Sequence, residues 1–112
     1  MAPPTLRPFE SLYRTLVRGA AKRHKFCDLS YEEFFEFTKI PDCHYCGAAL
    51  IWRIYRHPLE TIAYNLDYKN SSAGYTKDNL VTCCRRCNYG KMFAFTYEEW
   101  VLIGNLIRSW KK

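Results

Sequence analysis

The cysteines are the residues of this sequence whose type and spacing point most directly to chemistry. Cys43 and Cys46 form one C-x-x-C pair, and Cys84 and Cys87 form a second pair further along the chain. A C-x-x-C turn followed by a glycine, here Gly47, is typical of a metal-binding knuckle in which both sulfurs point toward one ion. Two such pairs supply the four thiolates of a closed, tetrahedral zinc site. We therefore predict a structural Zn²⁺ bound by all four cysteines.

Other interpretations of the cysteines fit less well. A C-x-x-C pair can be a redox motif, but that requires a thioredoxin-like βαβ pattern, which this sequence lacks. Cys83 adjoins Cys84 and could compete as a ligand, although pairing it with Cys87 would break the two-residue spacing. Cys27 is expected to be a small buried apolar residue. Zinc–thiolate binding can stabilise a small domain by on the order of 10 kcal/mol, so loss of one ligand could unfold this chain.

Composition and charge limit the class of protein. The 112 residues fit one domain, and the 48% of hydrophobic residues can fill a small core. Seventeen lysines and arginines against 11 acids give a net charge of +6, which favours nucleic acid as a partner. The start of the chain lacks the apolar region of a secretory signal, and no apolar run approaches the roughly 20 residues that span a bilayer. We expect an intracellular, cytoplasmic protein with no membrane partner, in which paired cysteines indicate metal rather than disulfide.

Helices are predicted on both sides of the cysteine pairs. Apolar residues at helical spacing indicate a basic amphipathic helix over residues 9–24. Capping boxes, Ser30 with Glu33 and Thr96 with Glu99, predict the starts of two more helices, the first of which ends at Pro41. The apolar face of the last helix is expected to consist of Trp100, Ile103, Leu106, Ile107 and Trp110.

Strands are predicted between the pairs. Residues 51–55 and 61–66 are rich in β-branched and aromatic residues and predict a hairpin with its turn at residues 56–58. A polar loop at residues 70–76 precedes a short strand over residues 80–82. A helix is then expected from the second cysteine pair through Phe95. These elements indicate an α+β fold: a small ββα core with flanking helices, held by the four-cysteine zinc site. The predicted divisions are a flexible arm, 1–8, and one domain, 9–112, with a helical part 9–40, a core 41–95 and a C-terminal helix 96–112.

Short motifs follow one another in a fixed order around the predicted strands. They are C-H-Y-C-G at 43–47, N-L-D-Y at 65–68, G-Y-T-K-D-N-L at 74–80, and C-R-R-C-N at 84–88 followed by Lys91. In this combination the chain resembles the HNH endonuclease family, especially its small phage and bacterial branch with two C-x-x-C pairs. The resemblance implies a ββα-metal (His-Me finger) fold, one catalytic divalent cation and cleavage of phosphodiester bonds, usually in DNA. It also suggests a phage or mobile-element context.

The resemblance implies roles for individual positions. Asp67 matches the acidic ligand of the catalytic cation, and Asn88 matches a second ligand of that cation. Asn79 matches the asparagine that braces the loop, and Lys91 matches a lysine common on the helix. The four paired cysteines match the zinc clamp. The residue after the acid is normally the general-base histidine, and in this chain it is Tyr68.

The identity of the base is therefore open. A phenol with a pKa near ~10 is protonated at neutral pH and is a poor base. The histidines of the chain are His24, His44 and His57, and each is expected to be structural or solvent-exposed. The remaining alternative is that no protein side chain acts as the base, which predicts slow turnover.

Ligand chemistry separates the two expected metals. The side-chain oxygens of Asp67 and Asn88 suit Mg²⁺, Mn²⁺ or a similar ion, whereas thiolates suit zinc. Basic residues in two groups are expected to contact nucleic-acid phosphates largely without regard to sequence. The groups are Arg85, Arg86 and Lys91, and Lys22, Arg23 and Lys25.

Two functions fit these observations. The first is a metal-dependent DNA endonuclease of HNH type that nicks DNA or cleaves it with weak specificity. The second is a zinc-stapled nucleic-acid-binding or inhibitor module that lost activity with the base, because Tyr68 stands where histidine is usual. An RNA substrate, the cleavage specificity and the oligomeric state all remain open.

Overall fold

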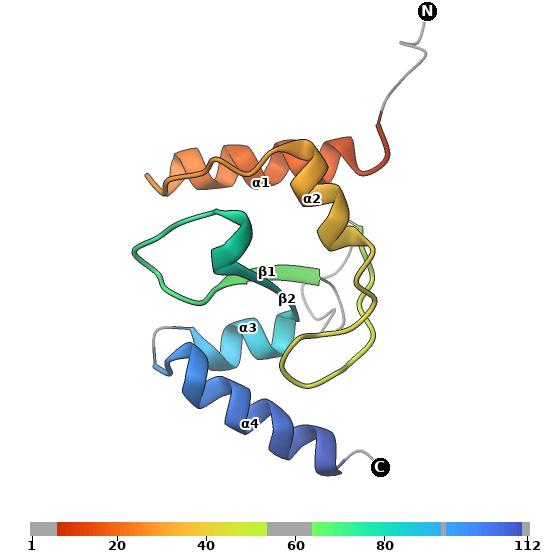
Figure 1. Ribbon diagram of the computed structural model, residues 1–112, viewed down its shortest axis with the longest axis vertical. Coiled ribbons are helices and arrows are strands. Elements are labelled where there is room, and N and C mark those ends of the chain that lie inside the picture. Colours follow the sequence, from red (N-terminus) through yellow and green to blue (C-terminus); the bar gives the residue numbers. More distant parts are fainter. Residues whose placement is uncertain (1–6, 54–63, 93, 111–112) are drawn as a thin grey trace, which may run out of the picture.

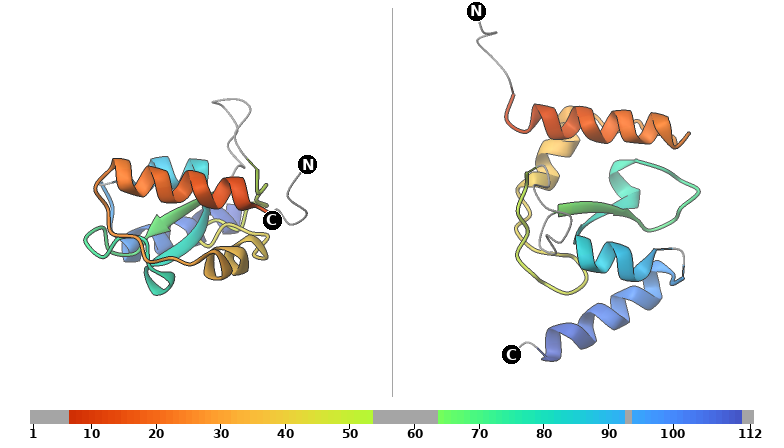
Figure 2. Two further views of the ribbon diagram at one scale, coloured as in Figure 1. Left: turned by 90° about the horizontal axis from the view of Figure 1, so that it is seen from above. Right: turned by 180° about the vertical axis from the view of Figure 1, so that it is seen from behind.

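Helices lie on both sides of a two-stranded sheet, as Figure 1 shows for the computed structural model. The structure describes residues 7–53, 64–92 and 94–110. Helices α1 and α2 cover one side of the sheet, and α3 and α4 lie on the other, an arrangement that persists in the other views (Figure 2). The elements are α1 (Glu10–Lys22), α2 (Tyr31–Thr38), β1 (Tyr64–Tyr68), the 3₁₀-helix η1 (Lys77–Asn79), β2 (Leu80–Cys84), α3 (Arg85–Lys91) and α4 (Tyr97–Trp110). The predicted α+β class is confirmed.

The sheet consists of β1 and β2, which pair antiparallel with Asp67 opposite Val81 and Tyr68 opposite Leu80. Strand β2 runs directly into α3, which completes a ββα unit. The predicted pairing of residues 51–55 with 61–66 is not the one observed. Residues 54–63 lie outside the described residues, residues 51–53 form no continuous strand, and the second predicted strand instead continues to Tyr68 and pairs with β2. Both candidate partners contain β-branched residues, so local composition could not decide between them.

Each face of the sheet contributes to a separate core because successive side chains on a strand point to opposite faces. On the α1–α2 side, the core comprises Leu12, Ala20, Leu29, Phe34, Phe37, Leu66, Tyr75 and Leu80. On the α3–α4 side, it comprises Cys43, Tyr45, Cys46, Val81, Cys83, Cys84, Cys87 and Trp100. Cysteines dominate the second core, so its packing depends on the four-cysteine cluster described below.

The two helix starts that were predicted from capping boxes are confirmed. Both predicted capping boxes are present, with reciprocal hydrogen bonds between Ser30 and Glu33 and between Thr96 and Glu99. The helix expected to run through Phe95 ends earlier, at Lys91, because Met92 adopts a left-handed φ of 36°. The predicted apolar face of the last helix is also only partly correct. Trp100 is buried, but Leu106 is 51% and Trp110 73% exposed.

Helix α4 packs closely against the backbone of the first cysteine turn. A Cβ atom at Gly104 would lie 2.4 Å from the carbonyl oxygen of Tyr45. The Arg108 side chain donates hydrogen bonds to the carbonyl oxygens of Cys43, His44 and Tyr45, at 3.2, 3.0 and 2.9 Å. The C-terminal helix therefore holds the turn that presents the first two cysteines.

Residues 1–6 of the predicted arm lie outside the described residues, and the proposed domain division remains a prediction. Across the described part of the chain, no helix combines the length and apolar character needed to cross a membrane.

Candidate active site and metal centre

The two cysteine pairs converge on one buried cluster. The sulfurs of Cys43, Cys46, Cys84 and Cys87 all lie within 4.8 Å of one another. Four sulfurs bound at about 2.3 Å to a tetrahedral zinc would be roughly 3.8 Å apart. The sulfurs of Cys46 and Cys84 are 3.8 Å apart. The cluster can therefore bind a metal ion, and its four soft ligands fit zinc.

The backbone fixes the directions of these sulfurs. The amide of Cys46 donates to the sulfur of Cys43 at 3.5 Å, and the amide of Cys87 donates to that of Cys84 at 3.4 Å. The first turn is attached to β2 because the His44 amide donates to the Thr82 carbonyl oxygen at 2.8 Å. One pair thus comes from a turn fixed on the sheet, and the other from the junction of β2 and α3.

Proximity also sets the acidity of these thiols. Hydrogen bonds with Cys84 and Cys87 lower the pKa of the Cys43 thiol, and the reciprocal contacts raise the pKa of Cys84 to about 11. Cys43 therefore loses its proton more readily than Cys84, whose proton is retained unless a cation replaces it. Arg86 donates to the Cys46 sulfur at 3.8 Å, so its positive charge offsets part of the negative charge of a thiolate cluster.

Cys83 is not part of this cluster. Its side chain is buried in the same core as Cys84, but its sulfur is not among the four that converge in the described part of the chain. Burial raises the pKa of the Cys83 thiol well above its usual value, and the nearby Asp67 carboxylate raises it further. Of the two adjacent cysteines that the sequence left open as ligands, it is Cys84 whose sulfur joins the cluster.

Asp67 lies at the edge of the second core, close to the cysteine cluster. Its carboxylate oxygen Oδ2 accepts a hydrogen bond from the Tyr45 hydroxyl at 2.5 Å. The same oxygen lies 3.1 Å from the ammonium nitrogen of Lys91 on α3. Asp67 and Lys91 are only 7% and 6% exposed. The carboxylate predicted to bind a divalent cation is therefore already paired with a cation of the chain itself.

A cleft of about 440 Å³ opens beside this ion pair. Lys91 lines it together with Lys69, Asn70 and Ser71 after β1 and with Tyr97 of α4. The Lys91 ammonium also donates to the carbonyl oxygen of Tyr68 at 3.3 Å. Two lysines thus face a cleft of a size that admits a phosphate group.

Asn88 and Asn79 occupy different surroundings. Asn88 on α3 hydrogen-bonds the Cys83 thiol, which places it on the same face of the sheet as Asp67. The buried Asn79 amide donates to the carbonyl oxygens of Asn70 and Gly74, at 2.9 and 2.8 Å, and accepts from the Asn70 amide at 2.9 Å. Asn79 therefore closes the loop between β1 and β2.

Tyr68, at the base position, faces the other core. Its ring packs edge to face on Tyr75, with centroids 5.0 Å apart, and Lys25 lies over it at 5.7 Å. Burial and a hydrogen bond with Tyr75 raise the pKa of the Tyr68 phenol far above its usual value. The structure therefore groups Tyr68 with Tyr75 and Arg23, whose guanidinium donates to the Tyr75 hydroxyl, and not with the partners of Asp67.

In the described part of the chain, neither His24 nor His44 lies in position to act as a base beside Asp67. His44 hydrogen-bonds the Tyr97 hydroxyl at 2.8 Å and stacks on that ring. His24 is exposed at the end of α1 with a left-handed φ of 55°. His57 lies outside the described residues.

Known proteins provide one comparison for this arrangement. No protein-family model matches the chain, and no curated protein matches its sequence. Among solved structures, the rare-cutting HNH restriction endonuclease PacI superposes with a TM-score of 0.74 over 97% of this chain and 83% of PacI. The chain has the HNH fold. Sequence identity is 20%, so the likeness concerns the fold, and at that level the predicted resemblance is confirmed.

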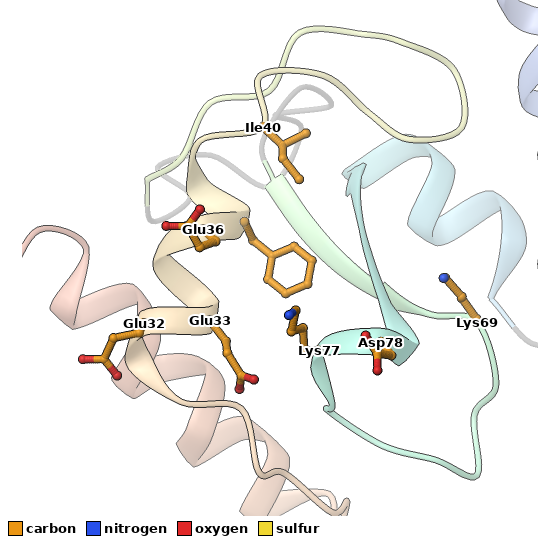
Figure 3. Close-up of a pocket in the computed structure, with 8 residues that line it drawn as sticks. Glu32, Glu33, Glu36, Ile40, Lys69, Lys77 and Asp78 are labelled. Carbon is orange, nitrogen blue, oxygen red and sulfur yellow. The ribbon is translucent and has the colours of Figure 1, made fainter.

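The chain also has a pocket rich in acidic residues, which shares Lys69 with the cleft beside Lys91. A pocket of about 490 Å³ lies between α2 and η1 (Figure 3). Glu32, Glu33 and Glu36 line one wall, and Lys77 and Asp78 of η1 line the opposite wall. The carboxylates disfavour a phosphate backbone on this side of the molecule.

Most of the basic residues predicted to bind phosphate contact other residues of the protein. Arg85 donates to the Tyr89 hydroxyl at 3.1 Å, and Lys25 reaches the Ser71 carbonyl oxygen at 3.4 Å. Lys22 is exposed in the last turn of α1. Arg23, Arg86 and Lys91 contact Tyr75, Cys46 and Asp67, as described above. The predicted basic groups are thus partly engaged within the protein.

Sequence reasoning missed two residues that hold the HNH core together. Tyr45 was seen only as part of the cysteine turn, yet its hydroxyl links that turn to Asp67. Arg108 carried no motif at all, although it binds consecutive carbonyl groups of the same turn. A buried tyrosine between two metal ligands was the available signal for the first residue, and the second has no local signal.

Proposed function

We propose that this protein is a divalent-cation-dependent DNA endonuclease that hydrolyses phosphodiester bonds. The observation that carries the proposal is the buried Asp67 carboxylate, which lies beside a lysine-lined cleft in an HNH fold. The PacI structure with this fold is that of a restriction endonuclease that perturbs DNA. A net charge of +6 supports a nucleic-acid substrate.

In this proposal, Asp67 and Asn88 hold the catalytic cation. A carboxylate and an amide oxygen are suitable ligands for Mg²⁺ or Mn²⁺, and the position of the positive Lys91 ammonium beside Asp67 supports a role for this carboxylate in binding a cation. When bound, such a cation polarises the phosphate and stabilises the leaving oxygen. Tyr45 orients the carboxylate by donating to Oδ2, and Asn79 fixes the loop that borders the cleft. The reaction also requires removal of a proton from the attacking water.

Tyr68 keeps its proton in this proposal. Its raised pKa means that the phenol oxygen is protonated at neutral pH and cannot accept the proton of water. In the described part of the chain, His44 pairs with Tyr97 and His24 is exposed at the end of α1, so we assign the base role to no side chain. We therefore expect slow turnover and a rate that rises with pH, since hydroxide becomes more available.

We further propose that the four cysteines bind structural zinc and that lysines beside the cleft contact the DNA backbone. Lys69 and Lys91 line the cleft itself, and Arg85 lies on α3. Contacts of this kind give a salt-dependent affinity with little sequence preference.

A second function is supported by Tyr68 itself. A phenol that faces the other core at the position of the usual base is consistent with a nucleic-acid-binding or inhibitor module. Such a module would retain the zinc cluster and the salt-dependent affinity for DNA but would not cleave in any cation.

Plasmid nicking separates the two functions. Zinc-loaded protein is incubated with supercoiled plasmid and Mg²⁺, Mn²⁺, Ni²⁺ or EDTA, beside the variants Asp67→Asn and Asp78→Asn. The endonuclease predicts cation-dependent nicking that is lost in Asp67→Asn and kept in Asp78→Asn, whose carboxylate lies on the acidic pocket. No nicking in any cation by folded protein that still binds DNA would support the binding module instead. Nicking that survives Asp67→Asn would show that our site is wrong.

A further inference from the structure

The Asp67–Lys91 ion pair joins a predicted cation ligand to a residue predicted to bind phosphate. The two charged atoms are 3.1 Å apart, and both side chains are almost excluded from solvent. A carboxylate buried at this depth requires a positive partner, because an uncompensated charge away from water is strongly unfavourable. Lys91 is the positive partner that the structure shows.

A divalent cation at Asp67 would remove the need for this partner. The ammonium and the cation would compete for the same oxygen, Oδ2, and would repel each other if both stayed there. Tyr45 donates to that oxygen as a neutral hydroxyl, so it is compatible with either occupant. Cation binding and retention of the Asp67–Lys91 pair are therefore mutually opposed.

The Lys91 ammonium can move from the Asp67 carboxylate into the adjacent cleft. It is the last residue of α3, and its side chain also lines the cleft formed with Lys69, Asn70 and Ser71. Lysine has a flexible four-carbon stem, so its ammonium can change partners without movement of the helix. A released ammonium would enter the cleft and become available to an anion there.

We propose that Lys91 is a displaceable internal cation: it neutralises Asp67 in the metal-free protein, and a divalent cation drives it into the cleft to bind a DNA phosphate. This inference rests on the proposed function. It implies that cation and DNA increase each other's affinity, because each favours the released position of Lys91. In the absence of a divalent cation, the same pair keeps the buried carboxylate neutralised and the core intact.

Chemical labelling of lysines tests the exchange on the wild-type protein. Zinc-loaded protein is treated briefly with an amine-acetylating reagent, with Mg²⁺ or with KCl at equal ionic strength, and each lysine is quantified by peptide mass spectrometry. We expect Lys91 to be protected in KCl and labelled several-fold more in Mg²⁺, with the exposed Lys69 labelled equally in both. In Asp67→Asn, Lys91 should be labelled in both conditions because its charged partner is gone. Labelling of Lys91 that does not respond to Mg²⁺ in the wild type would overturn the inference.

Cation affinity gives a second readout. Mn²⁺ binding is measured by titration calorimetry for the wild type, Lys91→Met and Lys91→Arg, with Asp67→Asn to identify the site. Removal of the competitor in Lys91→Met should tighten Mn²⁺ binding by roughly tenfold, whereas arginine retains the positive charge and should not. Unchanged or weaker binding in a folded Lys91→Met protein would contradict the proposal.

The failures of the two proposals are distinguishable. One possible result is nicking that requires Asp67 while the labelling of Lys91 does not respond to Mg²⁺. That result supports the endonuclease proposal and contradicts the exchange of Lys91. If no cation supports nicking, the endonuclease proposal is wrong. The exchange of Lys91 is then supported if Mg²⁺ increases Lys91 labelling in the wild type but not in Asp67→Asn, and it is contradicted if Mg²⁺ has no effect in the wild type.

Discussion

At the scale of single residues, Tyr45 connects the two centres of the molecule. It lies between two cysteines of the cluster, it is 1% exposed, and its hydroxyl donates to Asp67. Burial and this hydrogen bond raise the pKa of the Tyr45 phenol far above its usual value, so it is a permanent donor. The orientation of the Asp67 carboxylate therefore depends on the turn that presents two of the metal ligands.

Replacement of Tyr45 by phenylalanine tests this connection. Tyr45→Phe removes one hydrogen bond to a charged acceptor and keeps the ring, so we expect a loss of about 1.5–3 kcal/mol of stability. Cation-dependent nicking should weaken as well, whereas the zinc content should be unchanged. Tyr89→Phe is the matched control, because Tyr89 is 56% exposed and should change stability by less than about 0.5 kcal/mol. Chemical denaturation of both variants measures the difference, and equal stabilities would argue against the role of Tyr45.

At the scale of elements, the site depends on how a loop and a helix are held against the sheet. Asn79 bonds to both sides of the loop that joins β1 to β2. Helix α4 approaches the cysteine turn so closely that Gly104 has no room for a side chain. Neither contact belongs to the regular hydrogen bonding of a helix or strand, so each can be tested by one substitution.

The loop contact predicts a large effect of a small change. Asn79→Ala leaves the buried Gly74 carbonyl and the partly buried Asn70 carbonyl without their donor, and we expect a loss of about 2–4 kcal/mol. Ser72→Ala in the same loop affects an exposed hydroxyl and should cost no more than about 0.5 kcal/mol. Thermal unfolding of the two variants gives the comparison. A similar effect of both would mean that the loop is not held through Asn79.

A pair of glycine substitutions tests the packing of α4. Gly104→Ala places a Cβ against backbone atoms of Tyr45, 2.4 Å from its oxygen, so the helix must shift at a cost of about 1–3 kcal/mol. Gly19→Ala on α1 meets only the flexible guanidinium of Arg23, at 3.2 Å. That change should stabilise the protein by up to about 1 kcal/mol, because alanine favours a helix more than glycine does. Opposite signs in denaturant unfolding are expected, and a stabilised Gly104→Ala would contradict the close packing.

At the scale of the whole molecule, the sheet divides the protein into two cores of different origin. The core on the α1–α2 side consists largely of aliphatic and aromatic side chains, whereas the core on the α3–α4 side consists largely of cysteines. A cluster of thiols excludes water but provides little apolar area, so a bound ion must supply much of the stability of that half. The four-cysteine cluster and the candidate cation site share this half, so we expect both to depend on the ion that we propose for the cysteines.

Adjacent cysteines provide the test of this dependence. Cys84→Ala removes a ligand of the cluster and should lower the zinc content and the unfolding temperature together. Cys83→Ala changes the neighbouring buried residue outside the cluster and should retain one zinc per chain. A colorimetric zinc-release assay and thermal unfolding measure both variants, and a strong chelator applied to the wild type should reproduce the Cys84→Ala result. Zinc loss in Cys83→Ala instead would reassign the fourth ligand.

The sequence alone determined those features that arise from short-range spacing. Two residues between cysteines fix a turn that can present both sulfurs, and two residues between Ser30 and Glu33 fix a capping box, because in each case the partners meet within one turn of backbone. The order of the motifs carried the resemblance to the HNH family, and that resemblance implied the fold. The α+β class followed from these local elements.

Only the tertiary structure decided which distant residues meet. Three contacts join residues that are far apart in the chain. They are the pairing of β1 with β2, the hydrogen bond from Tyr45 to Asp67 and the hydrogen bonds from Arg108 to the cysteine turn. Strand alternation then turned Tyr68 away from Asp67, and the end of α3 brought Lys91 to that carboxylate. Such contacts depend on the relative placement of whole elements, which burial of the two cores fixes and no local spacing encodes.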